Sequence, residues 1–294
     1  MKNQQHHQDC PFCQWVKEHP SYLIEKNNPS YLSLANISPD SEGHVLIITK
    51  EPRTNITELT KEEWANLLPL LKSTTNKITN TFYPQGFNIY SNAGAEGGAR
   101  QAVFHFHLHV VPEREGNRGV GYLRKPWFIP SVEKYQEIEK ALQVEQGIVK
   151  DNEKIIAKLV EREQASDYGH LVITSKEFNS HDLNQIDIKT WTQMGELLRE
   201  SIERIEQGLN PSSLRTCIFL GKIGGLNQAN NSQFQIHLIP RYKSQGHAAK
   251  EAIPIPPEVL EVAESLREAE SEIVEKKRKV EQLESQVEIP PKIK

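Results

Sequence analysis

The sequence contains little cysteine and no long apolar run. Three cysteines among 294 residues are too few, and odd in number, for a disulfide-stabilised scaffold, so the closely spaced Cys10 and Cys13 indicate a metal or redox role. No apolar run approaches the roughly 20 residues that a membrane-spanning helix needs. Residues 1–10 are polar and lack the apolar region of a signal peptide. We therefore expect a cytoplasmic protein that does not enter a membrane.

The sequence also lacks a large excess of charge of either sign. It has 35 Lys and Arg against 39 Asp and Glu, for a net charge of -4. This balance argues against broad binding of nucleic acid, which usually requires a strongly basic surface. At about 150 residues per domain, the length predicts two domains.

Three landmarks recur in the same order at a nearly constant offset. The recurring pairs are residues 43–51 with 169–177, Trp64 with Trp191, and residues 105–112 with 233–240. Val- and Ile-rich strands can resemble each other by chance, but here a Gly-His pair and a His-x-x-Pro pattern recur as well. The sequence therefore predicts two tandem units.

Each unit has the pattern of a small α+β fold. In the first, residues 44–49 form a buried-strand pattern, and Thr60 with Glu63 forms a capping box that begins a helix. A strand at 86–90, a Gly-rich loop at 93–99 and an alternating strand at 103–111 follow. We expect two α+β units, each an antiparallel sheet plus helices, joined as an intramolecular pseudo-dimer.

The C-terminal segment, residues 257–289, has a different pattern. Apolar side chains recur there at alternating spacings of three and four, with Lys276 in one of the slots. This pattern is typical of a coiled coil. A single amphipathic helix packed on the body of the protein fits it equally well. As a coiled coil, it would support a homo-oligomer or bind a partner.

Three histidines alternate with apolar residues near the end of the first unit. His105, His107 and His109 would point to one face of a strand. An imidazole has a pKa of about 6.5 and is largely neutral at physiological pH, which suits a nucleophile. An exposed His-rich strand and a three-His metal face are the alternatives to nucleophilic catalysis.

This stretch resembles the signature of the histidine triad (HIT) family, His-φ-His-φ-His-φ-φ with φ apolar. Residues 105–111 fit every position. Further matches are Gly43-His44 about sixty residues earlier, Asn36 eight residues before His44, Gln101 four residues before the triad, and Asn92 on the preceding strand. The resemblance implies the fold and chemistry of that family.

The resemblance implies that His107 attacks the α-phosphate of a purine nucleotide and forms a covalent nucleotidyl-histidine. It assigns phosphoryl binding and leaving-group assistance to His109, and a hydrogen-bonded set with them to His44 and His105. It assigns the ribose to Asn36, and the phosphate to Asn92, Gln101, Arg100 and the loop at 94–100.

The sequence departs from the family pattern at two positions near the triad. Ala102 replaces a frequent Ser or Thr, which removes one hydrogen bond. Arg100 replaces a usual Gly, as an extra phosphate ligand or a solvated arginine.

Catalysis of this kind needs no cofactor, but the resemblance extends to a branch that binds structural zinc. Cys10, Cys13 and His105 would supply three ligands. The expected fourth ligand falls on Pro52, which cannot ligate, so His6, His7 or His19 would have to replace it. Otherwise the site is a relic.

The second unit keeps only part of the motif. Gln233 and Gln235 stand at the positions of His105 and His107, while His237 and His170 remain. Glutamine cannot form the covalent intermediate, so we expect a degenerate unit. The predicted organisation is an active domain at 1–128, a linker at 129–152, a degenerate domain at 153–246 and the C-terminal helix at 257–289.

Two functions follow from these features. The first is a nucleotidyl hydrolase or transferase acting on purine nucleoside phosphoramidates, dinucleoside polyphosphates or related adenylylated compounds. A two-repeat family that acts on nucleotide sugars has a different residue at the third triad position, which His109 does not match. The second is a non-enzymatic nucleotide-binding adaptor that uses the C-terminal helix for partners.

Overall fold

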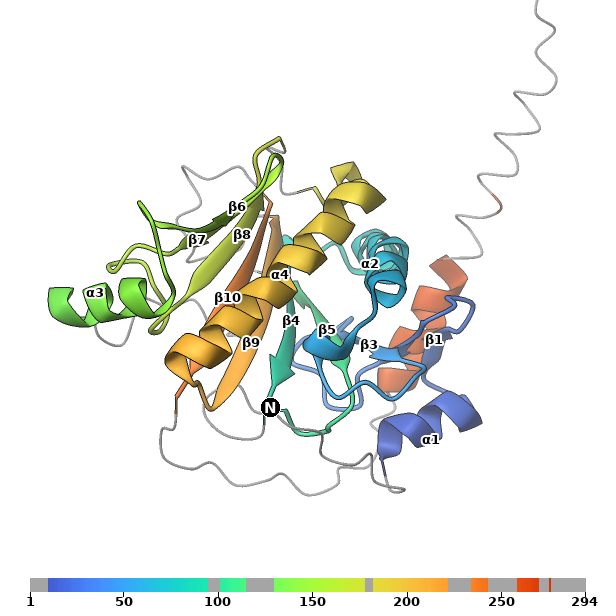
Figure 1. Ribbon diagram of the computed structural model, residues 1–294. Coiled ribbons are helices and arrows are strands. Elements are labelled where there is room, and N and C mark those ends of the chain that lie inside the picture. Colours follow the sequence, from blue (N-terminus) through green and yellow to red (C-terminus); the bar gives the residue numbers. More distant parts are fainter. Residues whose placement is uncertain are drawn as a thin grey trace, which may run out of the picture.

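A single ten-stranded antiparallel sheet forms the centre of the computed structural model (Figure 1). The structure describes residues 10–94, 101–114, 130–177, 182–221, 234–242 and 258–269, together with residue 275. The strand order is β1-β2-β3-β5-β4-β9-β10-β8-β7-β6. The first half supplies five consecutive strands and the second half the other five, in the same order counted from either edge.

The first half contains two helices and five strands. They are α1 (Pro11–Glu18), β1 (Leu23–Glu25), β2 (Tyr31–Ala35), β3 (Val45–Thr49), α2 (Lys61–Phe82), β4 (Gly86–Ala93) and β5 (His107–Glu113), with a 3-10 turn at Ile56–Glu58. Thr60 caps α2 by accepting from the Glu63 backbone N–H, and the Glu63 carboxylate accepts from Thr60 N–H. The predicted capping box and the strand at β3 are confirmed.

The second half has the corresponding elements. They are α3 (Val132–Ala141), β6 (Ile148–Asp151), β7 (Ile155–Leu159), β8 (Leu171–Ser175), α4 (Ile188–Leu209), β9 (Ser213–Gly221) and β10 (Gln235–Arg241), with a 3-10 turn at Leu183–Gln185. Helix α3 and strand β6 lie in the range predicted as a linker. The predicted α+β class with an antiparallel sheet is confirmed.

The two halves join through the sheet and through the helices above it. β4 pairs with β9 along its whole length, from Gly86 to Ala93. Above the sheet, Trp64 of α2 and Trp191 of α4 stack with ring centroids 4.7 Å apart. Each indole Nε1–H donates to the backbone carbonyl of the other tryptophan, at 2.7 and 2.8 Å. The helices can approach this closely because position 195 is a glycine: a Cβ there would lie 2.3 Å from Trp64 Nε1.

The strand predicted at 103–111 is wrong at both ends. β5 begins at His107, because the backbone before it bonds elsewhere: Phe106 N–H donates to the Arg53 carbonyl and Gln101 N–H to the Gly94 carbonyl. Pro112 does not end the strand but lies inside it, opposite Phe87. His105 therefore precedes β5, and only two of the three histidines share the strand.

The C-terminal segment packs on the first half where it is described. Residues 258–269 are helical, and Val259, Ala263 and Leu266 are buried. Arg267 Nη1 donates to the carbonyls of Ser21 and Leu23, which ties this helix to the β1 edge. For these residues the packed amphipathic helix is the observed arrangement. The remainder of the predicted segment, apart from residue 275, lies outside the described residues.

Within the described ranges, no helix is both long and apolar enough to span a bilayer.

Candidate active site

His107 and His109 lie on the sheet face opposite α2 and α4. Alternate residues of a strand point to opposite faces. Leu108 and Val110 of β5 belong to the main core together with both helices, whereas Val111 belongs to a smaller cluster on the other face. The two histidines have the same parity as Val111, so their rings project away from the helical layer.

The tautomer of His107 is determined by its own backbone. Its Nδ1 lies 2.8 Å from the carbonyl oxygen of His105, so Nδ1 carries the hydrogen and donates. Nε2 therefore holds the lone pair. Burial lowers the pKa of His107, which keeps the ring neutral at physiological pH. A neutral imidazole with a free, oriented lone pair is a competent nucleophile.

His109 is oriented by a chain of hydrogen bonds that begins at the Asp40 backbone. Asp40 N–H donates to His44 Nδ1 at 3.0 Å, so the neutral His44 carries its hydrogen on Nε2. His44 Nε2–H then donates to His109 Nδ1, also at 3.0 Å. This leaves His109 with a hydrogen on Nε2, which can donate to a phosphoryl oxygen or a leaving group.

Burial keeps this histidine pair neutral as well. It lowers the pKa of His44 to about 4, partly opposed by the nearby Asp40 carboxylate. The pKa of His109 lies well below its usual value, first through burial and then through the charges of His107, His44 and Arg215. Tyr90 stacks on the His109 ring at 4.4 Å, nearly parallel. The site therefore combines an acceptor nitrogen on one histidine with a donor nitrogen on its neighbour.

His105 belongs to a different cluster. Its Nε2–H donates to the Thr49 carbonyl at 2.8 Å, and its Nδ1 faces Cys13 Sγ at 3.4 Å and Cys10 Sγ at 3.6 Å. The resemblance assigned this ring to a hydrogen-bonded set with the other histidines; in the structure, where the chain turns before β5, the ring bonds to Thr49 and faces the two cysteines. Its carbonyl accepts from His107 Nδ1.

Cys10, Cys13 and His105 form a ligand set that suits zinc. Their ligand atoms all lie within 4.8 Å of one another. The hydrogen bond to Thr49 leaves Nδ1 of His105 as an acceptor, the arrangement usual for a metal-bound imidazole. Burial and Cys10 raise the pKa of Cys13 to about 11, so a cation would be needed to hold its thiolate. Among described residues no fourth ligand joins the cluster: His19 is exposed, and His6 and His7 lie outside the described ranges.

The predicted nucleotide-binding residues lie around the histidines in different ways. Asn36 Nδ2 is 3.2 Å from both ring nitrogens of His44, and its Oδ1 accepts from Ser38 N–H. Gln101 bonds to two described segments: its Nε2 donates to the Thr54 carbonyl and its Oε1 accepts from Gly94 N–H at 3.3 Å. Arg100 and the rest of the loop at 95–100 lie outside the described residues.

A cavity of about 520 Å³ opens beside Asn36 and His44. Its far wall is the C-terminal helix, through Val259, Val262 and Ser265. The helix that packs on the first half therefore lines the same cavity as Asn36, the residue that the resemblance assigns to the ribose. The sequence predicted either a coiled coil or a helix packed on the body here, and gave the helix no place near Asn36.

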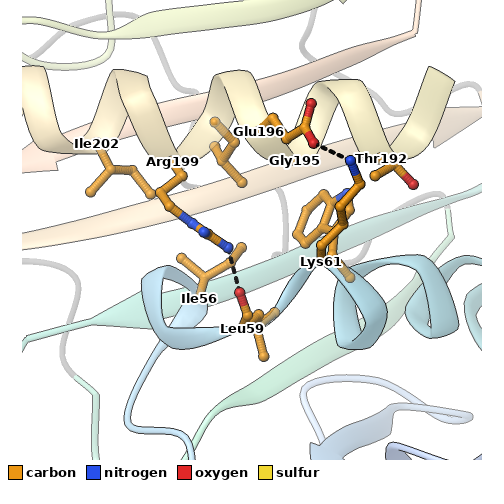
Figure 2. Close-up of a pocket in the computed structure, with 10 residues that line it drawn as sticks. Ile56, Leu59, Lys61, Thr192, Gly195, Glu196, Arg199 and Ile202 are labelled. Carbon is orange, nitrogen blue, oxygen red and sulfur yellow. Dashed lines mark hydrogen bonds and ion pairs between the residues drawn. The ribbon is translucent and has the colours of Figure 1, made fainter. Parts of the chain in front are cut away.

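Figure 2 shows a second, smaller pocket of about 160 Å³ between α2 and α4. Across it, Lys61 Nζ pairs with Glu196 Oε1 at 2.6 Å, and Arg199 donates to the Leu59 carbonyl. This pocket lies on the helical face of the sheet, away from the histidines. Its side chains hold the two halves together.

Arg215 is a site residue that sequence reasoning missed. It comes from β9 of the second half, yet its Nε donates to Asn92 Oδ1 at 2.8 Å and its guanidinium lies 4.7 Å from the centroid of the Tyr90 ring. A charged residue inside an otherwise buried strand was the available signal. That signal points to the site only once the pairing of β9 with β4 is known.

Comparison with known proteins agrees with this geometry. Residues 16–116 match the HIT domain. An uncharacterized HIT-like protein of Borreliella burgdorferi is 37% identical over 134 residues, which cover 44% of this chain and 93% of the relative. Adenosine 5'-monophosphoramidase hnt1 of Schizosaccharomyces pombe is 34% identical over 112 residues, 38% of this chain and 80% of the relative. The chain belongs to the HIT family.

Two solved structures share the fold over nearly the whole chain. A GalT-like protein of Arabidopsis thaliana aligns with a TM-score of 0.57 and 16% identity, covering 89% of this chain and 92% of that one. An ADP-glucose phosphorylase of the same plant aligns with a TM-score of 0.57 and 14% identity, covering 91% of each chain. At this level of identity the likeness concerns the fold.

Proposed function

We propose that the chain is a nucleotide hydrolase or nucleotidyl transferase with one active site, in its first half. The observation that carries the proposal is the opposed pair of tautomers. His107 presents a lone pair at Nε2, while His109, two residues along the same strand, presents an N–H. Attack on phosphorus requires the first state, and hydrogen bonding to a leaving group requires the second.

In the first step, His107 Nε2 attacks the α-phosphorus of the substrate. The P–Nε2 bond forms as the bond from phosphorus to the leaving nitrogen or oxygen breaks. His109 Nε2–H donates a hydrogen bond to that leaving atom, which takes up one proton from solvent, so the His44–His109 pair stays neutral throughout. The product of this step is a nucleotidyl-His107 and a protonated leaving group.

In the second step, water or another acceptor hydroxyl attacks the same phosphorus from the vacated side. Its proton passes to solvent while His109 Nε2–H donates a hydrogen bond to the reacting phosphoryl group, and the P–Nε2 bond breaks to release the nucleotide. His107 is neutral again, held by the His105 carbonyl. Hydrolysis and transfer differ only in the acceptor, so the site itself fits both.

The substrate we favour is an adenosine phosphoramidate or a related adenylylated compound. Several relatives are named adenosine 5'-monophosphoramidases, from Schizosaccharomyces pombe, Candida albicans and Saccharomyces cerevisiae. Asn36 borders the cavity next to His44 and is the proposed ribose contact. Asn92 is the proposed phosphate contact, joined by Arg100 from the loop, while the amide of Gln101 is engaged by two backbone groups.

We further propose that the second half is a degenerate repeat and that the halves form a pseudo-dimer. The matching strand order and the reciprocal Trp64–Trp191 bonds support this. The proposed boundaries remain 1–128 for the active domain and 153–246 for the degenerate one.

Structural zinc is proposed at Cys10, Cys13 and His105. When bound, the metal would cross-link the start of α1 to the segment before β5. That link would hold the His105 carbonyl in place for His107.

The test of the proposed function is mass spectrometry after brief mixing with adenosine 5'-phosphoramidate. We expect a nucleotidyl adduct on the wild-type chain and none on His107→Ala. The matched control is Gln235→Ala, the same strand position in the second half, which should still form the adduct. The chain could instead bind nucleotides but give neither an adduct nor turnover on any nucleoside phosphoramidate or dinucleotide. That result would overturn the proposed enzyme and favour the non-enzymatic nucleotide-binding adaptor.

A further inference from the structure

Arg215 stands in one lateral row with the proposed nucleophile, although it belongs to the other half of the chain. β9 pairs Arg215 with Asn92 of β4. β4 in turn pairs Tyr90 with His109 of β5, and the same register continued by two residues sets Asn92 opposite His107. The row across the sheet is therefore His107, Asn92 and Arg215, all on the face opposite α2 and α4.

The guanidinium of Arg215 makes two contacts that reach the site. Nε donates to Asn92 Oδ1 at 2.8 Å. The cation also lies over the Tyr90 ring. The same ring stacks on His109, with the ring centroids 4.4 Å apart. Arg215 is only 4% exposed. A buried guanidinium pays a large desolvation cost, so its placement against site residues is informative.

The bond to Asn92 has a directional consequence. An amide has one acceptor oxygen and one donor nitrogen. With Oδ1 engaged by Arg215, the Nδ2 hydrogens of Asn92 are turned to the other side of the amide. The row places His107 on that side, where the phosphoryl group would sit during attack.

We infer that Arg215 is a positioning residue of the active site: it holds Asn92 so that its amide N–H groups face the reacting phosphoryl group, and it adds a buried positive charge from the second half. The inference rests on the proposed function. It assigns the second half a part in the chemistry that its own altered motif does not suggest.

The corresponding row in the second half supports this assignment. β9 and β4 pair Phe219 with Asn88, and the β9–β10 register continued by one residue sets Gln235 opposite Phe219. Where the first half has histidine, asparagine and arginine, the second has glutamine, phenylalanine and asparagine. Of the two rows, only the one that contains His107 has the asparagine–arginine pair.

The experiment compares steady-state kinetics of Arg215→Met, Asn92→Ala and the double variant on adenosine 5'-phosphoramidate. Rates are referred to folded protein, measured by the unfolding transition of each sample. We expect Arg215→Met to lower kcat about 100-fold, the size of losing one aligned donor, with KM changed less than about threefold. The loss of kcat in the double variant should be smaller than the product of the two single losses, because Arg215 acts in part through Asn92.

Arg204→Met is the matched control. Arg204 is also an arginine of the second half and donates to two backbone carbonyls, those of Leu142 and Val149, away from the histidines. It should keep wild-type kcat per folded molecule. Equal kcat in Arg215→Met and Arg204→Met, or a double variant whose loss is the product of the single losses, would overturn the inference. A wild-type chain without turnover would instead overturn the proposed function.

Discussion

The two halves carry nearly identical histidine pairs in very different surroundings. His44 Nε2 lies 3.0 Å from His109 Nδ1, and His170 Nε2 lies 3.1 Å from His237 Nδ1. In both halves a backbone N–H donates to the first histidine, from Asp40 and from Ser166. The pair is therefore a feature of the local fold. By itself it does not distinguish one half from the other.

The difference lies in what flanks the pair. Under the His109 ring is Tyr90, stacked and covered by Arg215, whereas the residue opposite His237 is Cys217. The position of the proposed nucleophile is His107 in the first half, and Gln235 occupies the matching position in the second. The comparison teaches that the sheet supplies a general frame for a neutral histidine pair, and that a few side chains on one face decide whether it performs chemistry.

The largest expected effect separates the two pairs directly. His109→Gln should lower kcat by about 10²- to 10⁴-fold, because the leaving group loses the hydrogen bond from His109. His237→Gln should change kcat less than about twofold. Steady-state rates on adenosine 5'-phosphoramidate provide the measurement. A comparable loss in both variants would mean that the second pair also takes part in turnover.

The cysteines provide the next comparison. Cys13→Ser should lower the bound zinc per chain and the Tm, because the cluster loses a thiolate ligand. Cys217→Ser alters a buried thiol on β9 outside the cluster and should leave the zinc content unchanged. Elemental analysis of purified protein and thermal unfolding measure both. Equal zinc in all three proteins would exclude the proposed ligand set.

The pH dependence of stability should be shared between the halves. Burial lowers the pKa of His44 and of His237 to about 4. The unfolded chain, with an imidazole pKa of about 6.5, then binds more protons than the folded chain below pH 6.5. The contribution of each such histidine to the free energy of unfolding is fully present above that pH. It falls on acidification, by about 2 kcal/mol per histidine between pH 7 and 5.

Because other groups titrate too, a variant isolates this contribution. His237→Gln should show a smaller loss of unfolding free energy between pH 7 and 5 than the wild-type chain does. Chemical denaturation at both pH values measures it. The idea fails if the variant loses as much stability as the wild type.

The smallest expected effect compares two arginines that anchor helices to strand edges. Arg267 ties the C-terminal helix to the carbonyls of Ser21 and Leu23, and Arg204 ties α4 to those of Leu142 and Val149. Each change to alanine should lower the free energy of unfolding by about 1–3 kcal/mol, because hydrogen bonds to a charged group are lost. Denaturant midpoints test this. No loss in Arg267→Ala would show that the helix is held by its apolar face alone.

Much of the fold followed from pattern. The capping box at Thr60 and Glu63, the strand after Gly43 and the α+β class are local consequences of side-chain type and spacing. The start of β5 was missed, because His105 alternates with apolar residues like a strand residue but its neighbours bond to Arg53 and Gly94 instead. Arg53 is far from Phe106 in sequence, so no local pattern reveals that bond.

The sequence by itself determined the family and the histidine motif, because these depend only on residue type and order, and the recurrence of its landmarks led to the prediction of a second, altered unit. The tertiary structure decided which histidine nitrogens carry hydrogen, since that depends on the carbonyl of His105 and the backbone of Asp40. It also turned His105 toward the cysteines and brought Arg215 next to Asn92. Pairing of β4 with β9 joins residues more than a hundred positions apart, and only the folded chain sets that register.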